Sequence, residues 1–169
     1  MVVKKPSTIS RKDEFQGGEK VKADMVDIGN KPPILRVAKA EGVIKLKPES
    51  IRLIKEGKVK KGDAFSNASL AAINAVKKTS DLIFLAHPIP ILNVDVDFKI
   101  DEEASQVLVS VEVKSIARTG VELEALNGVM IALLSIFDML KYVEKDEKGQ
   151  YPNTSIGEIK VIKKQKELI

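Results

Sequence analysis

The chain has 169 residues, of which 28 are Lys or Arg and 24 are Asp or Glu, giving a formal net charge of +4. This length suits one domain with an ordinary hydrophobic core. The chain contains no cysteine and one histidine, which excludes disulfides, thiolate nucleophiles, iron–sulfur clusters and Cys/His zinc sites. Carboxylates are the only side chains left to hold a metal, and we predict neither a metal nor a cofactor.

The lysines near the N-terminus are not followed by an apolar run, so we expect no secretory signal and a cytoplasmic protein. The longest apolar stretch, residues 125–137, is interrupted by Asn127 and Gly128 and is too short to cross a bilayer. The mild basic excess favours anionic ligands, and aromatic residues at 4% predict no base-stacking surface. We therefore expect neither a membrane nor a nucleic acid as a partner.

Residues 1–33 are rich in Lys, Gly, Pro and Ser, which predicts a flexible N-terminal arm. We expect one domain over residues 34–169. Its first element is a half-buried strand over residues 34–46, where apolar and polar residues alternate and Gly42 interrupts the pattern.

Two helices and a hairpin follow this strand. A short helix over residues 48–56 has a proline in its first turn, and a longer helix over residues 64–78 follows Asp63, a natural N-cap residue. Residues 91–100 and 106–117 both alternate strictly and are joined by a short polar turn, which predicts two paired antiparallel strands.

The C-terminal third predicts a long helix and a last strand. Thr119 and Glu122 have the spacing of a capping box that would open a helix over residues 119–143, and residues 156–162 form the strand. This order of elements predicts an α+β fold, a ferredoxin-like split βαβ arrangement with an additional helix. Helices should cover one face of the antiparallel sheet, and we expect subunits to associate through the other face.

The only histidine, His87, lies in an apolar loop and is followed by Pro88 and Pro90. Proline fixes its own φ angle and restricts the residue before it, so His87 is held in an extended conformation. Two interpretations stay open: a core histidine that bonds to backbone, or a ring positioned for binding or proton transfer.

Lys60 and Lys61 lie just before the helix that begins near residue 64. The positive end of a helix dipole disfavours further positive charge, so these lysines and the free N–H groups would suit a phosphate. Burial of such a lysine would also lower the pKa of its amine. The alternative is a solvated basic loop, since lysine side chains are mostly exposed.

The long predicted helix has acidic residues at both ends. Glu122 has a local role in the capping box, whereas Glu124 has none and is the better candidate for a ligand-facing carboxylate. At the other end, Asp138 and Lys141 are three residues apart and are therefore neighbours on the helix surface. They form either an exposed ion pair or a buried pair whose pKa values are perturbed. Glu124 and Asp138 are separated by about 21 Å of helix. Either the ligand is long, or each helix end serves a pocket shared with another subunit.

Four segments together carry a resemblance: residues 61–63, 77–88, 119–126 and 138–141. They are similar in order and spacing to the motifs of the MoaC family, cyclic pyranopterin monophosphate synthases of molybdenum cofactor biosynthesis. The resemblance implies a ferredoxin-like fold, a hexamer built from dimers, and an active site at the dimer interface. It also implies lyase activity on a GTP-derived substrate, the cyclic dihydro-GTP (3′,8-cyclo-7,8-dihydroguanosine 5′-triphosphate) made by the preceding radical enzyme, with release of pyrophosphate.

The resemblance also implies roles for individual residues. It makes Lys61 and Lys141 catalytic, with Asp138 as their acidic partner. Substrate-binding positions are implied at Asp27, Arg36, Ala86, His87, Glu122, Leu123 and Glu124.

The chain departs from the family at several positions. Ala86 replaces a cysteine, Phe84 replaces a proline, and Ser69 replaces a basic residue. The Gly-rich C-terminal tail of bacterial members, which contains a lysine, is absent, and Lys163 or Lys164 is a candidate replacement. A non-catalytic, oligomeric nucleotide-binding or regulatory protein on the same fold is therefore the alternative function.

Overall fold

The computed structural model describes residues 23–168, so residues 1–22 of the predicted arm lie outside the described residues. Residues 23–33 contain no helix or strand and are mostly exposed. The elements that follow are β1 (Ile34–Lys45), α1 (Pro48–Lys55), α2 (Ala64–Lys77), α3 (Thr79–Leu82), β2 (Ile91–Asp101), β3 (Gln106–Ala117), α4 (Glu122–Glu144) and β4 (Ser155–Glu167).

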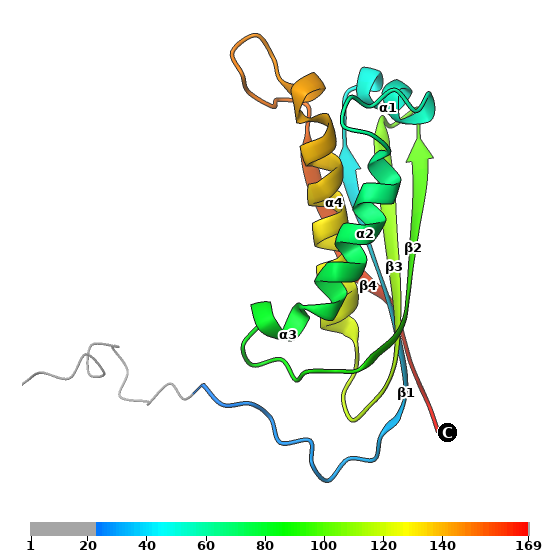
Figure 1. The fold of residues 1–169 in the computed structure, drawn as a ribbon, viewed down its shortest axis with the longest axis vertical. Coiled ribbons are helices and arrows are strands. Elements are labelled where there is room, and N and C mark those ends of the chain that lie inside the picture. The colour runs from blue at the N-terminus through cyan, green and yellow to red at the C-terminus, as the bar shows by residue number, and fades with distance from the viewer. Residues whose placement is uncertain (1–22, 169) are drawn as a thin grey trace, which may run out of the picture.

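The four strands form one antiparallel sheet in the order β2-β3-β1-β4. Helices α2 and α4 lie side by side over one face of this sheet, as Figure 1 shows. The pairs β1/β2 and β3/β4 are each split by a central strand, which is the ferredoxin-like arrangement. The predicted α+β fold is confirmed, with α1 as the expected additional helix; the short helix α3 is not among the predicted elements, because residues 79–82 are expected to form a loop.

Small and β-branched side chains fill the space between the helices and the sheet. Ala38 and Ala40 of β1 and the alternate valines of β3 face the helices, and all are fully buried. At Gly42 a Cβ atom would lie 2.8 Å from the side chains of Val129 and Leu133 on α4. Glycine is therefore needed where α4 packs most closely on β1. The strand itself continues through Gly42, and only its pairing with β4 shifts there.

The predicted capping box at the start of α4 is wrong. The helix begins at Glu122 after Val121, and no side chain caps it. Thr119 lies two residues before this N-cap position, so it cannot fill the role predicted from spacing. The Glu122 carboxylate instead forms an ion pair with Lys164 of β4, a contact between distant parts of the chain that overrides the local motif.

Helix α4 is the one helix among the described residues that is long and apolar enough to match a membrane span by composition. Its side chains at Ala125, Val129, Leu133 and Ile136 are fully buried within the hydrophobic core. The helix is apolar because the sheet and α2 cover it, which is the pattern expected of the core helix of a folded domain.

The C-terminal end of α4 is joined to the start of α1 by a reciprocal pair of contacts. The fully buried Glu144 accepts hydrogen bonds from Lys47 N at 3.0 Å and from Ser50 Oγ at 2.5 Å, and also from the hydroxyl of Thr154. In return, Lys47 Nζ donates to the carbonyls of Val143 (2.9 Å) and Lys145 (2.7 Å). Glu144 therefore satisfies a free N–H group at the start of α1, and Lys47 satisfies two free carbonyl groups at the end of α4.

Candidate functional site

Asp138 bridges two lysine side chains at the C-terminal half of α4. Lys61 Nζ lies 2.7 Å from Asp138 Oδ2 and also donates to the Asp138 carbonyl at 3.0 Å. Lys141 Nζ lies 2.7 Å from Asp138 Oδ1. The structure therefore brings together all three residues for which the sequence predicts catalytic roles.

The loop before α2 holds Lys61 in this position. Gly62 has a φ angle of 107°, which a residue with a side chain rarely adopts, so glycine permits the turn here. Asp63 then caps α2 as predicted, accepting from the backbone N–H groups of Phe65 and Ser66 at 2.9 Å. On the other side, Lys60 N donates to the Tyr142 hydroxyl at 3.0 Å and ties the loop to α4.

Asp138 and Lys141 each keep their charge near neutral pH. Hydrogen bonds from Lys141 and then Lys61 lower the pKa of Asp138 to about 2. The same bond to Asp138 raises the pKa of Lys141. Of the two alternatives for Asp138 and Lys141, the structure of the single chain has the exposed ion pair, because the Lys141 side chain is 45% exposed and that of Asp138 is 54% exposed. The cluster offers ammonium groups suited to anionic oxygens such as those of phosphate.

The opposite end of α4 carries a buried carboxyl group. Glu124 is 3% exposed, and its Oε2 atom has no hydrogen-bond partner among the described residues. Burial, followed by the nearby charge of Glu122, raises the pKa of Glu124. Glu124 therefore keeps its proton to higher pH than an exposed glutamate. Leu123, between the two glutamates, is exposed.

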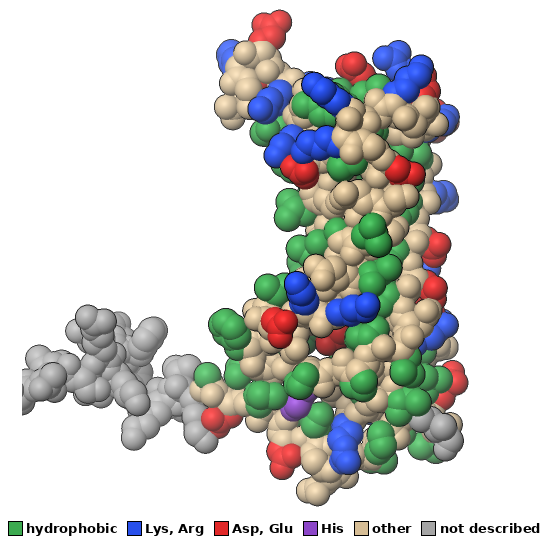
Figure 2. All heavy atoms as spheres, viewed as in Figure 1, with side chains coloured by type: hydrophobic (Ala, Val, Ile, Leu, Met, Phe, Trp, Pro, Cys, Tyr) green, Lys and Arg blue, Asp and Glu red, His purple; other side chains and the backbone are tan. Residues whose placement is uncertain are grey.

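His87 is half-buried and lines a hollow of about 240 Å³ at this same end of the molecule. Ile28 and Pro33 of the arm form one wall, and the residues between β3 and α4 form another. Ala86 is buried, whereas Phe84 is 86% exposed. Figure 2 shows hydrophobic side chains gathered around this end of the molecule, which fits the predicted apolar setting of the histidine.

Arg36 and Asp27 also lie at the His87 end. Arg36 donates to the carbonyls of Ala117 and Arg118, both at 3.4 Å, so it is attached to the end of β3. Asp27 is exposed in the arm and accepts from Gly29 N at 2.7 Å. Arg118 donates to the Lys31 carbonyl at 2.8 Å and ties the arm to this end of the sheet.

Lys163 and Lys164 lie on opposite faces of the sheet. Lys164 pairs in register with the buried Ala38, so it faces the helices, where it contacts Glu122. Lys163 lies on the other face, 3.3 Å from Glu112 Oε2. Of these two candidate lysines, Lys164 is the one that touches another predicted site residue.

The predicted residues thus form two groups at the two ends of α4. One group is the Lys61, Asp138 and Lys141 cluster, and the other surrounds His87, Glu122 and Glu124. Because α4 is continuous, about 21 Å of helix separates Glu124 from Asp138. Among the described residues no group of three or more His, Cys, Asp or Glu side chains is placed to hold a metal ion.

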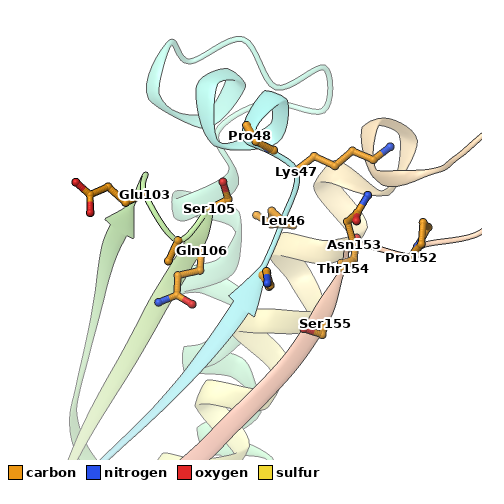
Figure 3. A pocket seen from close by; sticks show the side chains of 12 residues that line it. Leu46, Lys47, Pro48, Glu103, Ser105, Gln106, Pro152, Asn153, Thr154 and Ser155 are labelled. Atoms are coloured by element: carbon orange, nitrogen blue, oxygen red, sulfur yellow. The ribbon is translucent and has the colours of Figure 1, made fainter.

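A larger hollow, of about 760 Å³, contains none of the predicted site residues. Figure 3 shows it between the β2–β3 turn and the loop before β4, with Ser105, Gln106 and Asn153 among its lining residues. The Lys47 side chain also lines this hollow, and its ammonium group reaches the end of α4. The largest described hollow by volume and the predicted site residues therefore lie in different parts of the molecule.

The fold and the charged clusters define a small α+β protein of ferredoxin-like architecture with its candidate site at both ends of its longest helix. The chain belongs to the MoaC family, whose family model matches residues 25–167.

Named relatives match most of the chain. A Pyrococcus furiosus protein named "Probable cyclic pyranopterin monophosphate synthase" is 55% identical over 143 residues, covering 85% of this chain and 90% of that protein. One of the same name from Methanococcoides burtonii is 52% identical, covering 92% and 97%. A Methanothermobacter thermautotrophicus protein named "Probable cyclic pyranopterin monophosphate synthase accessory protein" is 48% identical, covering 90% and 95%.

Proposed function

We propose that this chain is a cyclic pyranopterin monophosphate synthase, a lyase of molybdenum cofactor biosynthesis. It would convert 3′,8-cyclo-7,8-dihydroguanosine 5′-triphosphate to cyclic pyranopterin monophosphate and release pyrophosphate. The observation that carries the proposal is the bridging of Lys61 and Lys141 by Asp138 in a member of the MoaC family. The names of its relatives support the same activity.

The cluster can serve two steps of this reaction. Lysine and carboxylate groups move protons while the purine-derived ring is opened and rebuilt. To form the cyclic phosphate, an oxygen of the sugar, such as the 3′-hydroxyl, attacks the α-phosphorus and loses its proton to a base. The bond between the α-phosphorus and the bridging oxygen breaks, and pyrophosphate leaves with that electron pair. Ammonium groups near the departing oxygens stabilise the charge that builds there.

The complete site is formed between subunits in this proposal. The two groups of residues lie at opposite ends of α4, too far apart for one small pocket in one chain. The apolar residues Leu82, Phe84 and Leu85 are 61%, 86% and 50% exposed beside the His87 hollow, as is usual for a surface covered in an assembly. We propose a homo-oligomer, a hexamer built from dimers, that works in the cytoplasm after the radical enzyme that supplies its substrate.

Incubation of the purified protein with the cyclic dihydro-GTP intermediate tests the activity directly. Formation of pyrophosphate and the pterin product supports it. The second candidate function, a non-catalytic binding or regulatory protein, is favoured by the accessory-protein name of one relative. It predicts binding of the intermediate with no release of pyrophosphate.

Removal of divalent cations should not abolish this activity. Within residues 23–168 no cluster of ligating side chains is placed for a metal ion, so the charge on the substrate phosphates is balanced by lysine and arginine. The measurement is turnover with EDTA and after addition of Mg²⁺. A large loss that Mg²⁺ restores would contradict this prediction.

Replacing Lys164 by methionine is expected to raise the KM for the substrate about tenfold, the effect of losing one charge-assisted hydrogen bond to phosphate. Lys164 faces the helices and contacts Glu122. Lys163→Met is the matched control, because Lys163 lies on the other face of the sheet beside Glu112. Equal effects of the two substitutions on KM would show that Lys164 has no special part in binding.

A further inference from the structure

A buried polar contact joins α4 to the junction between α2 and α3. Asn127 of α4 is 6% exposed, and its Nδ2 atom donates to the Ala75 carbonyl at 2.9 Å and to Thr79 Oγ1 at 3.2 Å. Thr79 is 1% exposed and donates its hydroxyl to the same Ala75 carbonyl at 3.1 Å. A buried amide and a buried hydroxyl thus satisfy one another at the point where α2 ends.

From Thr79 a succession of backbone hydrogen bonds leads to His87. The Thr79 carbonyl accepts from Ile83 N at 2.9 Å, and the Ile83 carbonyl accepts from Ala86 N at 2.8 Å. Each bond closes a turn, so the path of the chain from residue 79 to residue 86 depends on the position of Thr79. His87 is the next residue.

The other end of the segment formed by residues 79–90 is also held by a buried hydroxyl group. Ser115 of β3 is fully buried, and its hydroxyl donates to the Pro90 carbonyl at 2.7 Å. Between the two anchors the side chains of Leu82, Phe84 and Leu85 are largely exposed. Apolar packing of these three side chains within the chain therefore contributes little to holding the segment. Ala86 is buried and Ile89 packs against the core, and the buried polar contacts lie at the two ends.

We propose that Asn127, Thr79 and Ser115 are positioning residues that hold segment 79–90 by its two ends and so set the place of His87 in the site. The part of this inference that concerns turnover rests on the proposed function. The part that concerns the location of the imidazole depends only on the hydrogen bonds described.

The single histidine makes the location of the imidazole directly observable. In protein labelled with ¹³C at the histidine Cε1 atom, His87 gives the one imidazole signal. Thr79→Val removes the hydroxyl and keeps the shape of the side chain, whereas Thr79→Ser keeps the hydroxyl. We expect Thr79→Val to shift or broaden the His87 signal and to raise KM on the order of tenfold with a smaller change in kcat. Thr79→Ser should restore both measurements to near the parent values.

Ser135→Ala is the matched control. Ser135 Oγ donates to Asn67 Oδ1 at 2.8 Å and also joins α4 to α2, but away from segment 79–90. The Ser135→Ala substitution should leave the His87 signal and the KM for the substrate unchanged. If Thr79→Val does not fold, Ser115→Ala tests the other anchor by the same two measurements.

Two results would overturn the inference: a parent-like His87 signal in folded Thr79→Val or Ser115→Ala protein, or an equal shift in Ser135→Ala. If the parent protein shows no turnover, the proposed function fails, while a displaced His87 signal in Thr79→Val still supports the positioning role. The NMR measurement therefore separates failure of the inference from failure of the proposed function.

Discussion

Replacing either Lys61 or Lys141 by alanine is expected to lower turnover of the cyclic dihydro-GTP intermediate by about 10²- to 10⁴-fold, the range for loss of a group that transfers protons or stabilises developing charge. Each ammonium group is held at 2.7 Å by Asp138. Both lysine side chains are more than 40% exposed, so their loss should hardly change the stability of the fold. The measurement is pyrophosphate release under substrate saturation, with thermal unfolding followed in parallel.

Lys58→Ala is a suitable control for these substitutions. Lys58 belongs to the same basic stretch, but it pairs with Glu56 and not with Asp138. Its removal lowers the net charge by the same amount as the loss of Lys61 and should leave turnover near the parent value. Near-normal rates in both Lys61→Ala and Lys141→Ala would show that the assigned roles are wrong.

Replacing Glu144 by alanine is expected to lower the free energy of unfolding by about 3 kcal/mol. The fully buried carboxylate accepts hydrogen bonds from Lys47 N, Ser50 Oγ and the Thr154 hydroxyl, which would all lose their partner. Unpaired buried donors are costly, and the start of α1 and the segment before β4 would lose a common attachment. Chemical denaturation at fixed protein concentration measures the effect, since assembly also contributes to apparent stability.

Glu147→Ala provides the comparison for Glu144→Ala. Glu147 lies three residues further along the chain and is exposed. Its removal changes the net charge equally without breaking a buried contact. The two variants should therefore differ by nearly the whole expected effect. Similar unfolding curves for both would mean that the Glu144 contacts add little to stability.

The fold follows from local patterns to a large extent. Strict alternation predicts β2 and β3, and Asp63 followed by a helical pattern predicts the start of α2. The start of α4 could not be predicted in this way, because the spacing of Thr119 and Glu122 does not reveal that Lys164 binds the Glu122 carboxylate. Strand β4 continues to Glu167, beyond its alternating part, because its backbone pairs with β1 as far as Leu35.

In the candidate site, too, contacts between residues close in the sequence can be predicted, whereas contacts between distant segments cannot. Asp138 and Lys141 are three residues apart on a helix, so their pairing can be predicted from spacing. Lys61 reaches Asp138 from 77 residues away, and only the packing of the loop before α2 against α4 brings them together. The contacts of Glu144 and Asn127 also come from distant segments, and no local motif indicates them.

Helix α4 is continuous between the two groups of predicted site residues, so the proposed function depends on the length of this helix. Each residue of an α-helix turns the chain by about 100° and advances it by about 1.5 Å. Inserting or deleting one residue between Glu124 and Asp138 would leave every side chain present but rotate one group by more than a quarter turn relative to the other. The proposed function therefore makes the spacing along this helix as strict a requirement as the identity of the charged residues near its ends.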